Sequence, residues 1–184
     1  MWRTVAVVAW AIGLSNPSLS SGARAKYAKV VRTIAGQRKI DPFTIVSMVH
    51  NESRWRSGVV SRDGEDLGLG QIRARYIGAC RKDRDPVRNP SRACRAVKAR
   101  LLTPIYNLRL VGAAITAWRK LCKKKVGRAL FQDWLHGYGG MGRPPGILCG
   151  HRRTPKGWRP LRVHPILRRI MDRRRMLIRR QPRR

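Results

Sequence analysis

The sequence predicts a mainly helical fold that is interrupted by one short loop or small hairpin. Apolar residues recur at helical spacing in segments 26–39 and 42–53, and Thr103-Pro104 opens a longer stretch of the same kind that runs to about 124. Between them, segment 58–70 is rich in Gly, Asp and Ser and lacks this spacing. The chain has 184 residues, 42% of them hydrophobic, which suits one compact domain with terminal segments.

The remaining elements follow from the same criteria. Helical patterns predict further short helices at 71–79, 91–102 and 128–135. After Gly137 the chain becomes rich in Gly and Pro, and from His151 it is dominated by arginine until an apolar stripe appears in 161–176. We therefore expect one folded domain over 26–150 and an Arg-rich C-terminal extension over 151–184.

The amino terminus has the three parts of a secretory signal peptide. Arg3 gives a basic start, an apolar run covers 5–14, and Ala23-Arg24-Ala25 offers a cleavage site between small residues. We expect residues 1–25 to be removed on export and the product to be periplasmic or secreted. The alternative is an uncleaved anchor, for which the apolar run has about half of the ~20 residues that a membrane-spanning helix needs.

The cysteines agree with export to an oxidising compartment. Their number is even, and no CxxC pair suggests zinc or redox chemistry. Of the three possible connectivities, the favoured one pairs Cys80 with Cys94 and Cys122 with Cys149, because each bond then joins neighbouring segments. Four buried thiols are the alternative.

The charge of the chain points to an anionic partner. Lys and Arg number 42 against nine acids, for a formal net charge of +33. Such a surface attracts nucleic acid, anionic lipid or an acidic cell-wall polymer. We expect the Arg-rich extension to hold the protein on anionic envelope polymers, unless basic residues simply cover every surface. Segment 164–176 could instead form a helix that packs on the domain.

Glu52 is a candidate general acid. Asp41 and Pro42 give the preceding helix its N-cap and its first residue. Glu52 then lies seven residues after Ile45, in line with the apolar face and near the helix C-terminus. Burial and the negative end of the helix dipole both raise the pKa of a carboxyl there. The alternative is a solvated Glu52, or one paired with Arg54 or Arg56.

Several short motifs occur in a familiar order. Glu52-Ser53 ends a helix, Gly68-Leu69-Gly70-Gln71 follows a polar loop, and Tyr106-Asn107-Leu108 and Tyr138 come later. Over roughly 40–142 this order resembles the soluble lytic transglycosylases, and Asp66-Leu67-Gly68-Leu69-Gly70-Gln71-Ile72 resembles the small specialised members that accompany secretion machines. The sequence departs from the family pattern at Gly70, where the family has Met, at Gly139, where it has Asn, and at Gly112, which lies one residue farther from Asn107.

The resemblance implies a fold and an activity. The expected fold is lysozyme-like, and the expected reaction cleaves the MurNAc-GlcNAc bond of peptidoglycan without water, leaving 1,6-anhydromuramic ends. Glu52 would act first as acid and then as base. The residues expected to bind substrate are Ser53, Gly68, Gly70, Gln71 and Tyr138. No cofactor or metal is expected, because the spacing of the four histidines is not that of a metal site. A secretion apparatus is an expected partner and nucleic acid is not.

Two other functions remain open. A lysozyme-like hydrolase would need a second carboxylate, for which Asp63, Glu65 and Asp66 are candidates. A non-catalytic basic protein that binds nucleic acid or the envelope would explain the arginines but not the Glu and Gln motifs. Aromatic residues at 55, 134 and 158 are tryptophans that could stack on sugars, although core tryptophans are more common.

Overall fold

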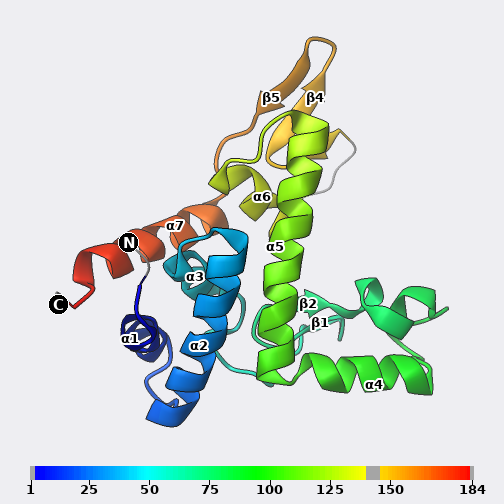
Figure 1. The fold of residues 1–184 in the computed structure, drawn as a ribbon. Coiled ribbons are helices and arrows are strands. Elements are labelled where there is room, and N and C mark those ends of the chain that lie inside the picture. The colour runs from blue at the N-terminus through cyan, green and yellow to red at the C-terminus, as the bar shows by residue number, and fades with distance from the viewer. Residues whose placement is uncertain (1–2, 140–145, 183–184) are drawn as a thin grey trace.

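The computed structural model describes residues 3–139 and 146–182, and one long helix stands in its middle with most of the other helices on one side of it (Figure 1). The central helix is α5, and α2 lies beside it. The helices, in chain order, are α1 Val5–Ser15, α2 Ser21–Arg38, α3 Pro42–Ser53, α4 Arg92–Leu101, α5 Pro104–Val126, α6 Phe131–Tyr138 and α7 Pro165–Arg180. The prediction of a mainly helical chain is confirmed.

Two small antiparallel sheets complete the fold. β1 (Asp66–Leu67) pairs with β2 (Ile72–Arg73), and two turns of 3-10 helix follow, η1 (Ala74–Tyr76) and η2 (Gly78–Lys82). The second sheet has the order β3-β4-β5. Its strands are β3 Ile147–Leu148, β4 His151–Thr154 and β5 Gly157–Pro160. The predicted hairpin between the helices is therefore present.

The helix expected over 71–79 is wrong. Gln71 has a left-handed backbone with a φ of +46°, and Ile72 pairs with Leu67 across the hairpin. Gly68 and Gly78 also have positive φ, a conformation that favours glycine and interrupts a right-handed helix. The apolar residues of this segment therefore belong to the second strand of a hairpin and to two short 3-10 helices.

The apolar amino-terminal run forms α1 and packs against α2. Thr4 caps it by accepting a hydrogen bond from the Val7 backbone N–H at 3.3 Å, and Val8, Ala11 and Ile12 are fully buried. The expected cleavage after Ala25 falls inside α2, so removal of residues 1–25 would uncover this apolar contact. Cleavage itself stays a prediction. Within 3–139 and 146–182, no helix combines the length and apolarity that a membrane span requires.

The Arg-rich extension divides into two parts. Segment 147–160 forms the β3-β4-β5 sheet, whose β4-β5 hairpin stands out beyond the end of α5 (Figure 1). Segment 165–180 is α7, which packs across α3 and buries Leu167, Ile170 and Leu177. The packed helix that the sequence left open is therefore present, and only the hairpin projects.

Both expected disulfides are present. Cys80 in η2 bonds with Cys94 in α4, and Cys122 near the end of α5 bonds with Cys149 just before β4. No cysteine is left free. The first bond fixes the short helices that follow the β1-β2 hairpin. The second fixes the base of the projecting hairpin on the central helix.

Candidate active site

Glu52 lies in the last turn of α3, at the boundary between the buried core and the surface. Its start is fixed by Asp41, whose Oδ1 accepts a hydrogen bond from the Phe43 N–H at 3.1 Å. Its end is set by Arg54, which takes a left-handed backbone with a φ of +51° while its N–H donates to the His50 carbonyl at 2.9 Å. Most of α3 is buried against the core, so Glu52 in the last turn lies where that core meets a groove.

The environment of Glu52 favours its protonated form. Burial raises the pKa of Glu52 from 4.5 to about 7, and the negative charge of Asp66 also raises this pKa, while hydrogen bonding from the Asn51 side chain lowers it. Within the described parts of the chain, no Lys or Arg nitrogen lies within 4.0 Å of the carboxylate. Arg56 instead donates to the Ser53 carbonyl at 3.3 Å.

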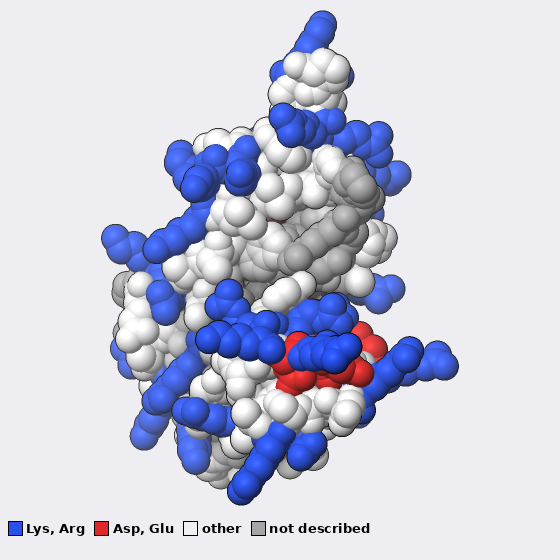
Figure 2. Space-filling model, turned by 90° about the vertical axis from the view of Figure 1, so that its right-hand side faces the viewer, with Lys and Arg blue, Asp and Glu red and all other residues white. Residues whose placement is uncertain are grey.

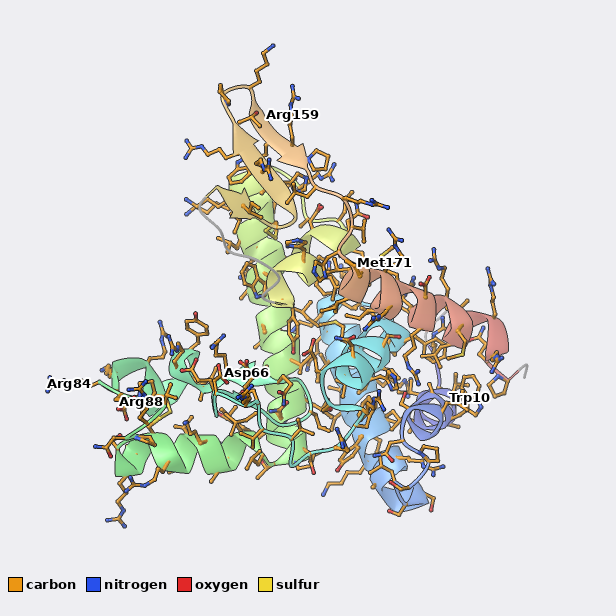
Figure 3. All side chains as sticks on the ribbon, turned by 180° about the vertical axis from the view of Figure 1, so that it is seen from behind. Trp10, Asp66, Arg84, Arg88, Arg159 and Met171 are labelled. Atoms are coloured by element: carbon orange, nitrogen blue, oxygen red, sulfur yellow. A yellow bond between two sulfur atoms is a disulfide. The ribbon has the colours of Figure 1, made fainter. Side chains whose placement is uncertain are left out.

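Glu52 lines a groove of about 940 Å³ that runs along α5. The other lining residues are Asp66, Gln71, Ile72, Arg73, Tyr76, Ile77, Leu110, Ala113, Ala114, Ala117, Trp118, Leu121, Tyr138 and Gly139. Figure 2 shows that acidic side chains on this face gather in one small patch among many Lys and Arg. Asp66, in strand β1 of the hairpin, lies beside α5 (Figure 3). One wall is thus apolar and supplied by α5, while the acids come from α3 and β1.

Asn107 fixes the loop between β1 and β2. Its Oδ1 accepts a hydrogen bond from the Gly70 N–H at 2.8 Å, and its Nδ2 donates to the carbonyls of Leu67 at 2.8 Å and Leu101 at 2.7 Å. The Ser53 hydroxyl donates to the Leu69 carbonyl at 2.8 Å. The loop that follows Glu52 in the motif order is therefore fastened to both α3 and α5.

Gly68 and Gly70 are needed for this close approach. A Cβ on Gly68, whose φ is +73°, would lie 2.5 Å from Asn107 Nδ2, and a Cβ on Gly70 would lie 2.2 Å from a Val111 methyl carbon. Neither glycine lines the groove, and nor does the buried Ser53. These three residues of the expected substrate-binding set therefore lie behind the groove wall and shape it.

Gln71 and Tyr138 do line the groove. The Gln71 amide donates to the carbonyls of Gly68 at 3.0 Å and Val59 at 3.2 Å, which leaves its Oε1 as the acceptor for a ligand. The Tyr138 hydroxyl donates to the Gly70 carbonyl at 2.8 Å. Burial, followed by the charges of Glu52 and Asp66, raises the pKa of Tyr138 well above its usual range, so the hydroxyl keeps its proton.

The three candidate second carboxylates have different surroundings. Glu65 is 1% exposed and accepts from Arg73 Nε and Arg75 Nε, both at 2.6 Å. Asp63 is exposed and binds Arg73 at 2.9 Å. Asp66 lines the groove with Glu52, and burial raises its pKa. Of these three, Asp66 is the one placed to meet a ligand.

Sequence reasoning missed two aromatic residues of the groove. Tyr76 is 54% exposed beside the hairpin, and Trp118 lies on the α5 wall and packs over Gly137. The spacing of Ala114, Trp118 and Leu121 on one face of α5 is the signal that could have found Trp118. In contrast, Trp55 and Trp134 are buried in the core and Trp158 lies on β5, so none of these three lines the groove.

A search of protein-family models gives no match, and neither the curated proteins nor the solved structures contain a significant match. Among the described residues, no group of three His, Cys, Asp or Glu could hold a metal ion.

Proposed function

We propose that this chain is an exported peptidoglycan lytic transglycosylase with a lysozyme-like arrangement of α3, the β1-β2 hairpin and α5. The observation that supports it best is the Glu52 carboxyl, which has a pKa of about 7, has no cationic partner among the described residues and lines a groove large enough for several sugar rings. A carboxyl with this pKa can give and take a proton near neutral pH. The motif resemblance supplies the substrate class.

In the proposed reaction, Glu52 serves twice. The protonated carboxyl gives its proton to the glycosidic oxygen of the MurNAc-GlcNAc bond, and that bond breaks. The resulting carboxylate takes the proton of the C6 hydroxyl of the same muramic acid, and the C6 oxygen forms a bond to C1. The ring closes as a 1,6-anhydro sugar and Glu52 is protonated again. The nucleophile is the C6 hydroxyl of the substrate itself, so its effective concentration is high. No second carboxylate is therefore needed.

The neighbouring residues have supporting roles in this proposal. The Oε1 of Gln71, which accepts no hydrogen bond from the described residues, can accept one from a sugar hydroxyl or N-acetyl N–H. Asn107, Ser53 and Tyr138 hold the hairpin loop, which keeps Gln71 in place beside Glu52. Gly139 offers no side chain where the family has Asn, so the corresponding substrate contact is absent.

Mass spectrometry of the products tests the proposal. Purified peptidoglycan digested with the mature protein should release muropeptides that end in 1,6-anhydromuramic acid. The absence of any soluble fragment would contradict catalysis on this substrate. Fragments that end in reducing muramic acid would contradict the transglycosylase and identify a hydrolase.

A hydrolase is the second candidate, and Asp66 is the observation that favours it. Asp66 lines the same groove as Glu52, and a second carboxylate could position water or stabilise a glycosyl intermediate. The motif resemblance favours the transglycosylase. A basic protein without catalysis would explain the net charge but gives no role to an unpaired carboxyl with a raised pKa.

The proposal places the protein in the periplasm or outside the cell. Two disulfides are compatible with that location, because they form and persist in oxidising compartments. Peptidoglycan strands are the proposed substrate. A secretion apparatus is proposed as partner from the motif resemblance.

A further inference from the structure

A cluster of cations lies beyond the end of α5 at which the groove wall stops. The α5 wall of the groove ends at Leu121, and the next residue is Cys122, which is bonded to Cys149 at the base of the projecting sheet. Figure 1 shows the β4-β5 hairpin standing beyond this end of α5, and Arg159 projects from it (Figure 3). The hairpin therefore lies beyond the end of α5 at which the apolar wall of the groove stops.

The hairpin and the last turn of α5 are densely basic. Lys123, Lys124 and Lys125 are exposed. Four more exposed cations lie on the hairpin, and we call these four residues the basic arm: Arg152, Arg153, Lys156 and Arg159. Within 3–139 and 146–182, none of them forms an ion pair with Asp or Glu. This end of the molecule therefore presents unneutralised positive charge.

The arrangement of the basic arm is unfavourable without a ligand. Arg152 lies directly opposite Arg159 in the antiparallel β4-β5 pair. Like charges at directly opposite positions repel and destabilise a sheet. An anion bound between or beside the two guanidinium groups would remove that repulsion and would gain the bidentate hydrogen bonds that arginine offers to carboxylates.

The basic arm is also held firmly. In addition to the disulfide, the Arg153 N–H donates to the Gly146 carbonyl and the Leu161 N–H donates to the Gly150 carbonyl, both at 2.7 Å. His151 is buried at the base, with Nδ1 2.8 Å from the Cys149 carbonyl oxygen. The backbone that carries the four cations is therefore fixed on the end of α5, which limits where these side chains can reach.

We propose that the basic arm is a second substrate-binding site, which binds the carboxylates of the peptides attached to a peptidoglycan strand whose glycan lies in the groove. This inference rests on the proposed function for the identity of the strand. The position of the basic arm beyond the Leu121 end of the groove favours the substrate strand itself over a separate polymer, and the arginines without an acidic partner among the described residues favour carboxylates as ligands.

Helix α7 offers a matched set of charges at another place. It lies across α3, on the side of the molecule away from the β1-β2 hairpin (Figure 1). Its exposed arginines include Arg168, Arg169, Arg179 and Arg180, and none of these forms an ion pair with an acid of the described chain. Removing four charges from α7 changes the net charge as much as removing the four of the basic arm.

The test compares two variants with four substitutions each. The arm variant is Arg152→Gln, Arg153→Gln, Lys156→Gln and Arg159→Gln, and the control variant is Arg168→Gln, Arg169→Gln, Arg179→Gln and Arg180→Gln. Each lowers the formal charge by four, which on the Glu52→Gln background is from +34 to +30. Both are made with Glu52→Gln present, so that binding is measured without cleavage. Circular dichroism and thiol titration confirm that each variant is folded with both disulfides.

Binding is measured by sedimentation with two preparations of sacculi that lack phosphate-bearing wall polymers. One preparation is intact, and in the other the peptide carboxyls have been converted to neutral methylamides. At low salt the arm variant should bind intact sacculi at least about tenfold more weakly than the parent, since each lost cation reduces the electrostatic attraction. The control variant should stay within about twofold of the parent. On amidated sacculi the parent and both variants should bind alike.

Three outcomes would overturn the inference. Equal weakening by the arm and control variants would mean that only net charge matters. A defect of the arm variant that persists on amidated sacculi would exclude carboxylates as the ligand. Binding that depends on the basic arm only after a phosphate-bearing polymer is added would identify a different partner. Failure of the proposed function has a separate signature: the parent chain with Glu52 intact would release no fragments from either preparation.

Discussion

The two glutamates of this chain lie thirteen residues apart in sequence and have opposite surroundings. Glu65 is buried between Arg73 and Arg75, each 2.6 Å from one of its oxygens. Glu52 lies at the edge of a groove with no ion-pair partner among the described residues, and its pKa is raised to about 7. The chain has 42 Lys and Arg, so the Glu52 carboxyl can lack an ion-pair partner only because the fold keeps these side chains at a distance from it. Glu65 is therefore structural, and Glu52 is free to react.

The strongest test of this contrast replaces the ionisable carboxyl of Glu52 by an amide. Glu52→Gln keeps the shape of the side chain but cannot donate or accept a proton in turnover, so the rate of peptidoglycan clearing should fall by a factor of about 10² to 10⁴. Turbidity of a peptidoglycan suspension measures it. Activity within a few fold of the parent would show that Glu52 is not the acid.

The same variant should change how stability depends on pH. The folded pKa of Glu52 is above its ordinary value of 4.5, so ionisation of Glu52 takes nothing from the stability of the parent below pH 4.5 and lowers it as the pH rises towards 7. Glu52→Gln lacks this loss, and at about pH 8 its free energy of unfolding should exceed that of the parent by up to about 3 kcal/mol. Urea denaturation at about pH 4 and about pH 8 measures the difference. A difference that does not change with pH would contradict the raised pKa.

Glu65→Gln should lower the stability of the protein and leave its activity nearly unchanged. It removes the carboxylate from Arg73 and Arg75, and both guanidinium groups are partly exposed and can be rehydrated, so the cost in unfolding free energy should be about 1–3 kcal/mol. Activity per folded molecule should remain within a few fold. Thermal denaturation and the turbidity assay together measure both quantities. A loss of activity as large as that of Glu52→Gln, in a folded protein, would mean that Glu65 takes part in the reaction.

Asp66→Asn should have the smallest effect if the enzyme is a transglycosylase. Its rate should stay within about threefold of the parent, because the substrate supplies the nucleophile. The upper limb of its pH profile should move to lower pH, since removing the Asp66 charge lowers the pKa of Glu52. A fall of more than about a hundredfold, with products that have reducing ends, would favour the hydrolase.

Much of the site follows from local sequence signals. Asp41 and Pro42 give the start of α3, the apolar spacing gives its buried face, and together they predict a partly buried Glu52 with a raised pKa. The disulfide partners follow from closeness in sequence, and both bonds are present. These features depend on residues that are near each other along the chain, which is why the sequence alone could predict them.

The errors concern residues whose partners are far away in sequence. Gln71 looks like the first residue of a helix until Asn107, 36 positions later in the chain, fixes the preceding loop through Gly70 and Leu67. Gly68 and Gly70 were expected to admit a sugar, whereas the space above them is filled by Asn107 and Val111. No local pattern shows which side chain occupies the space that a glycine leaves.

The hydrogen bonds of Asn107 limit which residue types could replace it. Its amide gives two hydrogen bonds to carbonyls and receives one from an N–H, all in a site without solvent exposure. Aspartate has the same size but cannot donate in its ionised form, and it would place a negative charge against two carbonyl oxygens. Glutamine has the same groups on a side chain that is one methylene too long for this space. Asn is therefore the residue type whose size and hydrogen-bonding groups fit this position, although Asn107 does not line the groove.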